Sequence, residues 1–126
     1  MPIRYQVKED GNFLHAVAHG ALSLEEIKDH FEDIEKSPVL NQEYRALVDL
    51  RQVGDLRMDL ESIRSLVSMH GTSREGNLLR PSRIALLVRD RPIYLAARQY
   101  EDRAHGAGLR VQVFLDENEA LVWLSY

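Results

Sequence analysis

The sequence predicts an α/β fold in which strands and helices alternate along one domain, residues 1–126. An unbroken aliphatic run, Ile84–Val88, is typical of a parallel strand that is covered on both faces. Segments with apolar residues at helical spacing stand between such runs, and several of them begin with capping residues. The expected order is ββαβαβαβα, which gives a mixed five-stranded sheet with helices packed against it.

The chain begins with a predicted β-hairpin. Ile3, Tyr5 and Val7 alternate with polar residues, and a second extended run covers residues 13–18. Residues 9–12, Glu-Asp-Gly-Asn, lie between the two runs and have the composition of a turn. We therefore expect the first strand to be antiparallel to the second.

A first helix and a third strand follow the hairpin. Ser23 and Glu26 have the spacing of a capping box, which predicts a helix start at Ser23. Ser37-Pro38 ends this helix. Its apolar positions recur at helical spacing: Ile27, Phe31 and Ile34. The next apolar segment, Tyr44–Leu50, suits a strand that is covered on both faces.

Two further helices flank the aliphatic strand. Asp59 can cap a second helix that Gly71 ends. The apolar side of this helix is expected at Leu60, Ile63, Val67 and His70. Asp90 and Pro92 open a third helix, which ends at the glycines 106–108. Its buried positions are expected to be Ile93, Ala97, Tyr100 and Ala104.

A last strand and a short helix complete the pattern. Residues 111–115 form the strand, and Asp116 caps the helix that follows it. This helix is expected to bury Ala120, Trp123 and Leu124. In a sheet of this kind, any ligand crevice is expected at the carboxyl ends of the strands.

Composition excludes several classes of function. Sixteen basic and twenty acidic residues give a net charge of −4 at pH 7, which argues against a general nucleic-acid binder. The chain has no cysteine, so disulfides, thiolate nucleophiles and thiolate metal sites are excluded. No apolar run is long enough for a membrane span or the core of a signal peptide, so we expect a cytoplasmic protein.

Four segments together resemble a known fold: Gly20–Glu26, Leu47–Arg51, Arg83–Val88 and Val113–Leu124. Their order and spacing are similar to those of the STAS fold and, more closely, to those of the small stand-alone SpoIIAA-like family. The resemblance covers nearly the whole chain. It implies a STAS/SpoIIAA-like fold and a non-enzymatic domain that binds a protein or a small lipophilic molecule.

The antagonist branch of this fold carries a phosphorylation switch, a serine or threonine that follows the third strand. The matching stretch here, Asp49–Asp55, contains no hydroxyl residue. A phosphate needs such an acceptor. The resemblance therefore does not imply a phosphorylation switch in this chain.

The placement of four arginines after two predicted strands indicates a candidate anion site. Arg51 and Arg57 are expected to follow the third strand, and Arg89 and Arg91 the fourth, so they should gather at one edge of the sheet beside two helix N-termini. Asp49, at the end of the third strand, belongs to the same candidate site. The alternative is a solvated ionic rim that the arginines form with Asp49, Asp55, Asp59 and Asp90.

Two further features are candidates for ligand or partner contacts. Tyr94 and Arg98 lie one turn apart on the third helix. They either project toward the crevice or a partner subunit, or the tyrosine ring covers the edge of the core and the arginine stacks over it. Residues 72–82 lack clear periodicity. They form either a functional loop or a helix extension in which Leu78 and Leu79 seal the core.

No catalytic residue, metal site or cofactor site is expected. His15 and His19 lie too far apart on one strand to bind a single ion, and the other histidines have no partner at helical spacing: His30, His70 and His105. The serines 65, 68 and 73 lack a glycine-flanked elbow, and no phosphate-binding loop is present.

The sequence therefore predicts a binding or regulatory module that associates with a protein or a small molecule and forms a homodimer. The alternative is a carrier for an amphipathic ligand. In that case the arginines hold an acidic head group, and an apolar channel under Leu78 and Leu79 holds the tail.

Overall fold

The computed structural model describes residues 2–71 and 80–125. Its elements are β1 (Ile3–Lys8), the short 3-10 helix η1 (Glu9–Gly11), β2 (Phe13–Ser23), α1 (Leu24–Glu35), β3 (Glu43–Arg57), α2 (Leu60–Gly71), β4 (Arg80–Leu87), α3 (Arg91–Gly106), β5 (Val111–Phe114) and α4 (Glu117–Leu124). The predicted order of strands and α-helices is confirmed. None of the helices in the described ranges has the length and apolar character needed to cross a membrane.

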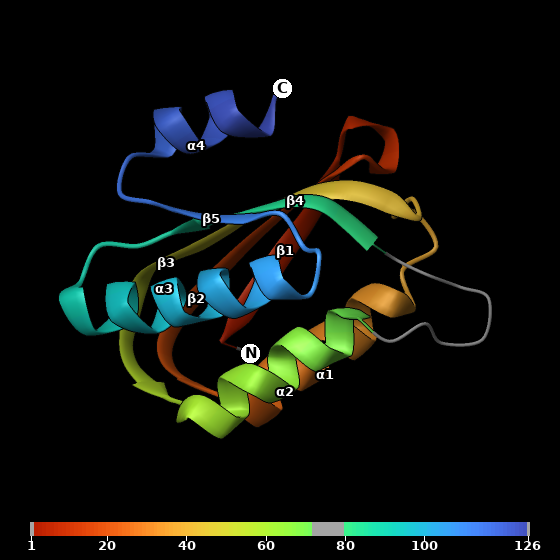
Figure 1. Cartoon of the computed structure of the whole chain (residues 1–126). Coiled ribbons are helices and arrows are strands. Elements are labelled where there is room, and N and C mark those ends of the chain that lie inside the picture. The colour runs from red at the N-terminus through yellow and green to blue at the C-terminus, as the bar shows by residue number, and fades with distance from the viewer. Residues whose placement is uncertain (1, 72–79, 126) are drawn as a thin grey trace.

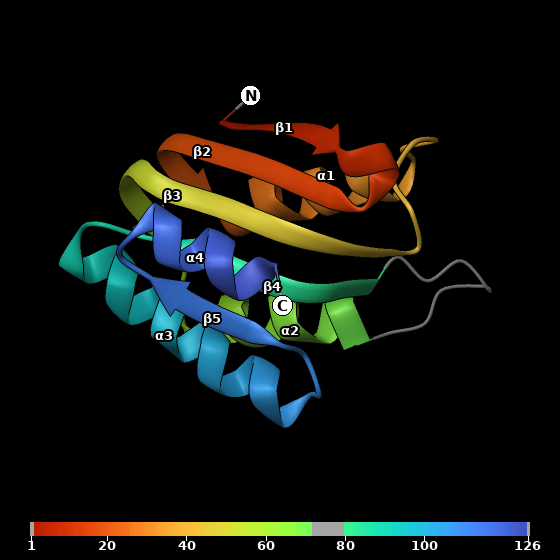
Figure 2. The same cartoon turned by 90° about the horizontal axis from the view of Figure 1, so that it is seen from above.

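The five strands lie in the sheet in their chain order, β1-β2-β3-β4-β5. β1 is antiparallel to β2, as predicted, and the other neighbours are parallel. Each new parallel strand is added on the same side, so right-handed crossovers place α1, α2 and α3 on one face of the sheet. The last helix, α4, covers part of the opposite face (Figures 1 and 2).

Local capping sequences start three of the helices where the sequence predicts. The capping box of α1 is present: Glu26 N donates to Ser23 Oγ at 3.3 Å, and Ser23 N donates to Glu26 Oε1 at 3.0 Å. The carboxylate of Asp59 accepts from Ser62 N at 2.9 Å, and that of Asp116 accepts from Asn118 N at 2.7 Å. Each of these bonds satisfies an amide that the helix itself leaves unpaired.

Two strands extend further at their carboxyl ends than predicted. The sequence indicates residues 13–18 and 44–50, whereas β2 reaches Ser23 and β3 reaches Arg57. Beyond two register shifts, the strands continue to pair as far as Ser23 and Arg57. The backbone pairing of these ends is independent of side-chain alternation, so the mixed polar sequence gives little sign of a strand. Arg51 and Arg57 therefore lie within β3 and do not follow it.

Three smaller predictions are wrong. Leu60 is 41% exposed, because α2 buries Ile63, Leu66 and Val67 instead. Leu115 lies outside β5 and is 65% exposed. The predicted loop 72–82 ends earlier than expected, since β4 begins at Arg80. The remainder of that loop, with Leu78 and Leu79, falls outside the described residues.

The sheet separates two apolar cores. Successive side chains of a strand point to opposite faces, so Ile84 and Leu86 of β4 pack toward α1–α3, whereas Ala85 and Leu87 pack toward α4. The larger core takes in Ile93, Ala97 and Ala104 of α3, as predicted, with Tyr100 half-buried. The smaller core lies under α4 and includes Ala120 and Leu124 of that helix.

Candidate functional site

An apolar cavity of about 130 Å³ lies between the sheet and helices α1–α3. Four strands and all three helices contribute to its wall. The lining extends from Tyr44 and Pro81, near the amino ends of β3 and β4, to Leu56 and Met58 at the carboxyl end of β3. The cavity thus runs beneath the sheet and is not confined to the carboxyl ends of the strands, where the sequence analysis expected a crevice.

Small side chains on facing walls explain the empty volume. Ala16, Ala18 and Ala46 line the cavity from the sheet, and Ala96 and Ala97 line it from α3. An alanine reaches only one carbon beyond the backbone, so opposed alanines do not meet across the gap between a sheet and a helix layer. Protein interiors are normally packed without such voids. The cavity is therefore encoded by residues that each look like ordinary core alanines.

Three lining side chains carry polar groups: His30, Tyr44 and Tyr100. The His30 ring lies edge-on to the Tyr5 ring, with 5.4 Å between the ring centroids. The centroids of the His30 and Phe31 rings are 5.9 Å apart. Burial raises the pKa of the Tyr44 phenol, with a further contribution from the charge of Glu35. Burial likewise raises the pKa of Tyr100, with a contribution from Tyr44. Both phenols are therefore protonated at neutral pH.

The candidate residues Asp49 and Arg51 lie on the other face of the sheet, where they bind each other. Arg51 Nε donates to Asp49 Oδ1 at 3.0 Å, and Nη2 donates to Asp49 Oδ2 at 2.8 Å and to Glu117 Oε1 of α4 at 2.8 Å. Burial acts to raise the pKa of Asp49, but the hydrogen bonds and charge of Arg51 outweigh it and hold this pKa below its usual range. Asp49 is therefore ionised and held by Arg51 near neutral pH.

Two of the other candidate arginines, Arg57 and Arg89, form separate ion pairs. Arg57 Nε lies 2.9 Å from Asp55, and Arg89 Nε lies 3.8 Å from its neighbour Asp90. Arg91 is exposed on the first turn of α3. Arg57 stands six residues beyond Arg51, up to about 20 Å away at strand rise. The contacts of the described residues pair Arg57 and Arg89 with neighbouring carboxylates, so the anion site and the solvated ionic rim both stay predictions.

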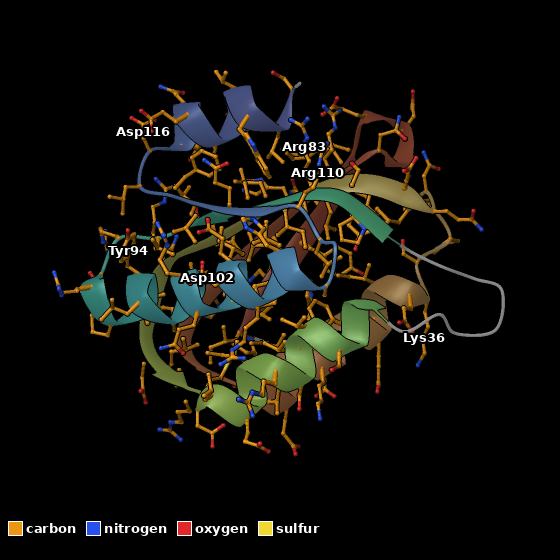
Figure 3. The ribbon with its side chains drawn as sticks, viewed as in Figure 1. Lys36, Arg83, Tyr94, Asp102, Arg110 and Asp116 are labelled. Atoms are coloured by element: carbon orange, nitrogen blue, oxygen red, sulfur yellow. The ribbon has the colours of Figure 1, made fainter. Side chains whose placement is uncertain are left out.

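The remaining candidates, Tyr94 and Arg98, belong to α3. Tyr94 lies on the first turn of the helix, half-buried against the larger core (Figure 3). Arg98 Nε pairs with Glu101 Oε1 at 3.1 Å. Glu101 is buried and accepts from the backbone N–H of Val113 at 2.7 Å. Together with the bond between His105 Nε2 and Val111 O at 2.9 Å, this contact covers the outer edge of β5 with α3.

Sequence reasoning missed two groups of residues. Glu101 occupies a position of the buried stripe of α3, four residues after Ala97, and a charge at such a position is the signal that could have found it. Arg45 and Arg83 were missed because their partners are backbone carbonyls of α4. Arg45 Nη1 donates to Leu124 O at 2.9 Å, and Arg83 Nη1 donates to Trp123 O at 2.6 Å with its guanidinium 5.4 Å from the indole centroid (Figure 3).

Metal binding finds no support in residues 2–71 and 80–125. Within these ranges, no group of three or more histidine, cysteine, aspartate or glutamate side chains could hold an ion. The side chain of His70 is not among those that the structure describes.

Comparison with solved structures identifies the fold. The chain is similar to an uncharacterised protein of the DUF3478 family from Shewanella loihica, which is described as having a SpoIIAA-like fold. The match has a TM-score of 0.63 and 20% sequence identity, and it covers 97% of this chain and 93% of that chain. No protein-family model matches the sequence, and no curated protein matches it. The predicted SpoIIAA-like fold, with a mixed five-stranded sheet, is thereby confirmed.

Proposed function

We propose that the protein is a non-enzymatic binding module that holds a small apolar or amphipathic molecule between its sheet and helices α1–α3. The observation that carries this proposal is the cavity of about 130 Å³, whose wall consists almost entirely of apolar side chains. Apolar cavities of this size take up apolar molecules such as benzene. Binding sites for small molecules have this character, with a few polar groups that orient the ligand.

The ion pair between Asp49 and Arg51 also supports a binding function without catalysis. A general base or nucleophile must reach its substrate, whereas the carboxylate of Asp49 is held by two nitrogens of Arg51. Asp49 and Arg51 moreover lie across the sheet from the cavity. Turnover of a substrate that is abolished by changing Asp49 or Arg51 would overturn this part of the proposal.

Benzene tests whether the cavity accepts a guest. A ligand that binds the folded state alone stabilises it by about 1.4 kcal/mol when present at roughly ten times its Kd. We therefore expect benzene to raise the unfolding temperature of the wild-type protein. The Ala97→Leu substitution places three more carbon atoms in the cavity wall, and it should abolish this rise.

The matched control is Ala21→Leu, because Ala21 is exposed on β2 and does not line the cavity. This variant should keep the full response to benzene. A wild-type protein that shows no response, or an Ala97→Leu variant that responds fully, would contradict the proposal. Native mass spectrometry of freshly purified protein then identifies the natural guest by its retained mass.

Association with a second copy of the chain is the second candidate function, and exposed apolar side chains near the C-terminus favour it. Leu121 and Val122 of α4 are 39% and 56% exposed, and Leu115 is 65% exposed. A twofold dimer would bring the same patch of each copy together. Sedimentation equilibrium should show a dimer for the wild type and a monomer for Val122→Glu. A monomeric wild type would remove this candidate.

A further inference from the structure

Two tyrosines from distant parts of the chain line one cavity. Tyr44 comes from the amino end of β3, and Tyr100 comes from α3. Both line the cavity, and Tyr44 lies close enough to Tyr100 to affect its ionisation. Apart from His30, whose ring contacts those of Tyr5 and Phe31, the other lining residues are aliphatic, aromatic or thioether side chains.

Neither phenol hydroxyl has a hydrogen-bond partner among the residues that the structure describes. Buried tyrosine hydroxyls usually find one. At the same time, no fully enclosed side-chain oxygen or nitrogen in the described ranges lacks a partner, so both hydroxyls must reach accessible space. Two tyrosines that line an otherwise apolar cavity therefore each carry an O–H group that is accessible and free to bind a guest.

The protonation of these groups fixes what they can bind. Burial raises the pKa of both phenols, so at neutral pH each keeps its proton and can donate it in a hydrogen bond. The described lining contains no lysine or arginine. The negative charge of Glu35 also acts on Tyr44, because it contributes to the raised pKa of this phenol. A carboxylate in this cavity would thus lose its hydration without gaining a cation, which is costly.

The volume limits the size of the guest. An apolar cavity of about 150 Å³ holds benzene, a molecule of six carbon atoms. The present cavity, of about 130 Å³, is close to this size. A long acyl chain would require the helices to move apart, whereas a molecule of roughly six to eight non-hydrogen atoms fits the cavity as it stands.

We infer that the cavity selects a small, neutral molecule with one hydrogen-bond-accepting oxygen, such as an alcohol, ketone or ester of roughly six to eight non-hydrogen atoms, and that Tyr44 and Tyr100 bind this oxygen. The inference rests on the proposed function and adds the class of ligand to it. It replaces the expected acidic head group at the arginines with a neutral group at two phenols.

Three probes of similar size test the inference: benzene, hexan-1-ol and hexanoate at pH 8. Chemical-shift titrations should show that hexan-1-ol binds about tenfold or more tightly than hexanoate, because the carboxylate loses hydration. The double variant Tyr44→Phe/Tyr100→Phe should bind hexan-1-ol about threefold to tenfold more weakly, the loss expected for a neutral hydrogen bond. Its affinity for benzene should not change.

Tyr94→Phe is the control, because Tyr94 lies on α3 but does not line the cavity. It should leave the affinities for all three probes unchanged. If Tyr44→Phe lowers the unfolding temperature, Tyr100→Phe alone provides the same test. Equal binding of hexanoate and hexan-1-ol, or a tyrosine-to-phenylalanine variant that retains full affinity for hexan-1-ol, overturns the inference. The proposed function still stands if benzene binds. If neither benzene nor hexan-1-ol binds, both fail.

Discussion

The two faces of the sheet are covered in different ways. Helices α1–α3 cover one face (Figure 1). The broad apolar layer on this face leaves a cavity. The single helix α4 covers part of the other face with a small core in which Ala85, Leu87 and Ala120 are completely buried. Arginines hold both ends of that helix: Arg51 binds Glu117 at its start, and Arg45 and Arg83 bind carbonyls at its end.

This difference shows that one sheet can support a tightly packed layer on one face and a loosely packed layer with a cavity on the other. The face under α4 combines close packing with directed polar contacts that fix the helix in one position. The larger face holds its helices through extensive apolar contact, which tolerates an unfilled volume because many other contacts remain. The predictions below test this division of roles.

The largest effect is expected from removing one leucine on each face of the same strand. Leu87 is completely buried under α4, whereas its neighbour Leu86 lines the cavity. Leu87→Ala should lower the free energy of unfolding by about 4 kcal/mol, and Leu86→Ala by about 2 kcal/mol, because leucine truncations cost more where the surroundings are fully packed. Urea denaturation followed by circular dichroism measures both. Equal costs would show that the two layers are packed alike.

A smaller effect is expected from Arg83→Met. This change removes the hydrogen bond to Trp123 O and the contact with the indole ring. It should lower the free energy of unfolding by about 2 kcal/mol. Trp123 is the only tryptophan of the chain, so its fluorescence reports on the docking of α4. In the variant, the fluorescence should change at a lower urea concentration than the circular dichroism.

The matched control is Arg110→Met, because Arg110 is exposed and lies directly before β5 (Figure 3). Its fluorescence and circular dichroism transitions should coincide with those of the wild type. If the two signals also coincide in Arg83→Met, then Arg83 does not hold α4 in place.

The parts of the structure that the sequence predicts are those with local causes. The caps at Ser23 and Asp116 join groups two or three residues apart, so their residue types alone indicate the helix starts. The strand Ile84–Val88 is indicated by its unbroken aliphatic run. In each case the cause lies within a short window of sequence, and the structure confirms the element.

The parts that escaped prediction have causes spread along the chain. Arg45 and Leu124, which bond through a side chain and a carbonyl, are separated by 79 residues. The cavity is lined by Ala16, Ala46 and Ala97, which are ordinary core residues individually and come together only because the fold brings β2, β3 and α3 to one cavity. The positions of Arg51 and Arg57 within β3 escaped prediction for the same reason: the extra length of β3 depends on its pairing with β2.

The smallest effect concerns the ionic contacts of β3, which contains the same triplet twice, Asp49-Leu50-Arg51 and Asp55-Leu56-Arg57. The Asp49 side chain is 8% exposed and its partner Arg51 also binds α4, whereas the side chains of Asp55 and Arg57 are 58% and 71% exposed. Asp49→Asn should lower the free energy of unfolding at pH 7 by about 1.5 kcal/mol. Asp55→Asn should change it by less than about 0.5 kcal/mol, as is usual for exposed pairs.

The pH dependence gives the sign of the Asp49 contribution. The pKa of Asp49 in the folded protein lies below the value of about 3.9 that an aspartate has in an unfolded chain. Its carboxylate therefore stabilises the fold above about pH 4, and this contribution is lost as the pH falls through the lowered pKa. The gap in unfolding free energy between the wild type and Asp49→Asn should be full at pH 7 and shrink as the pH is lowered below 4. A gap that stays constant over this range would show that the asparagine costs stability through packing, and that Arg51 holds α4 without help from the charge of Asp49.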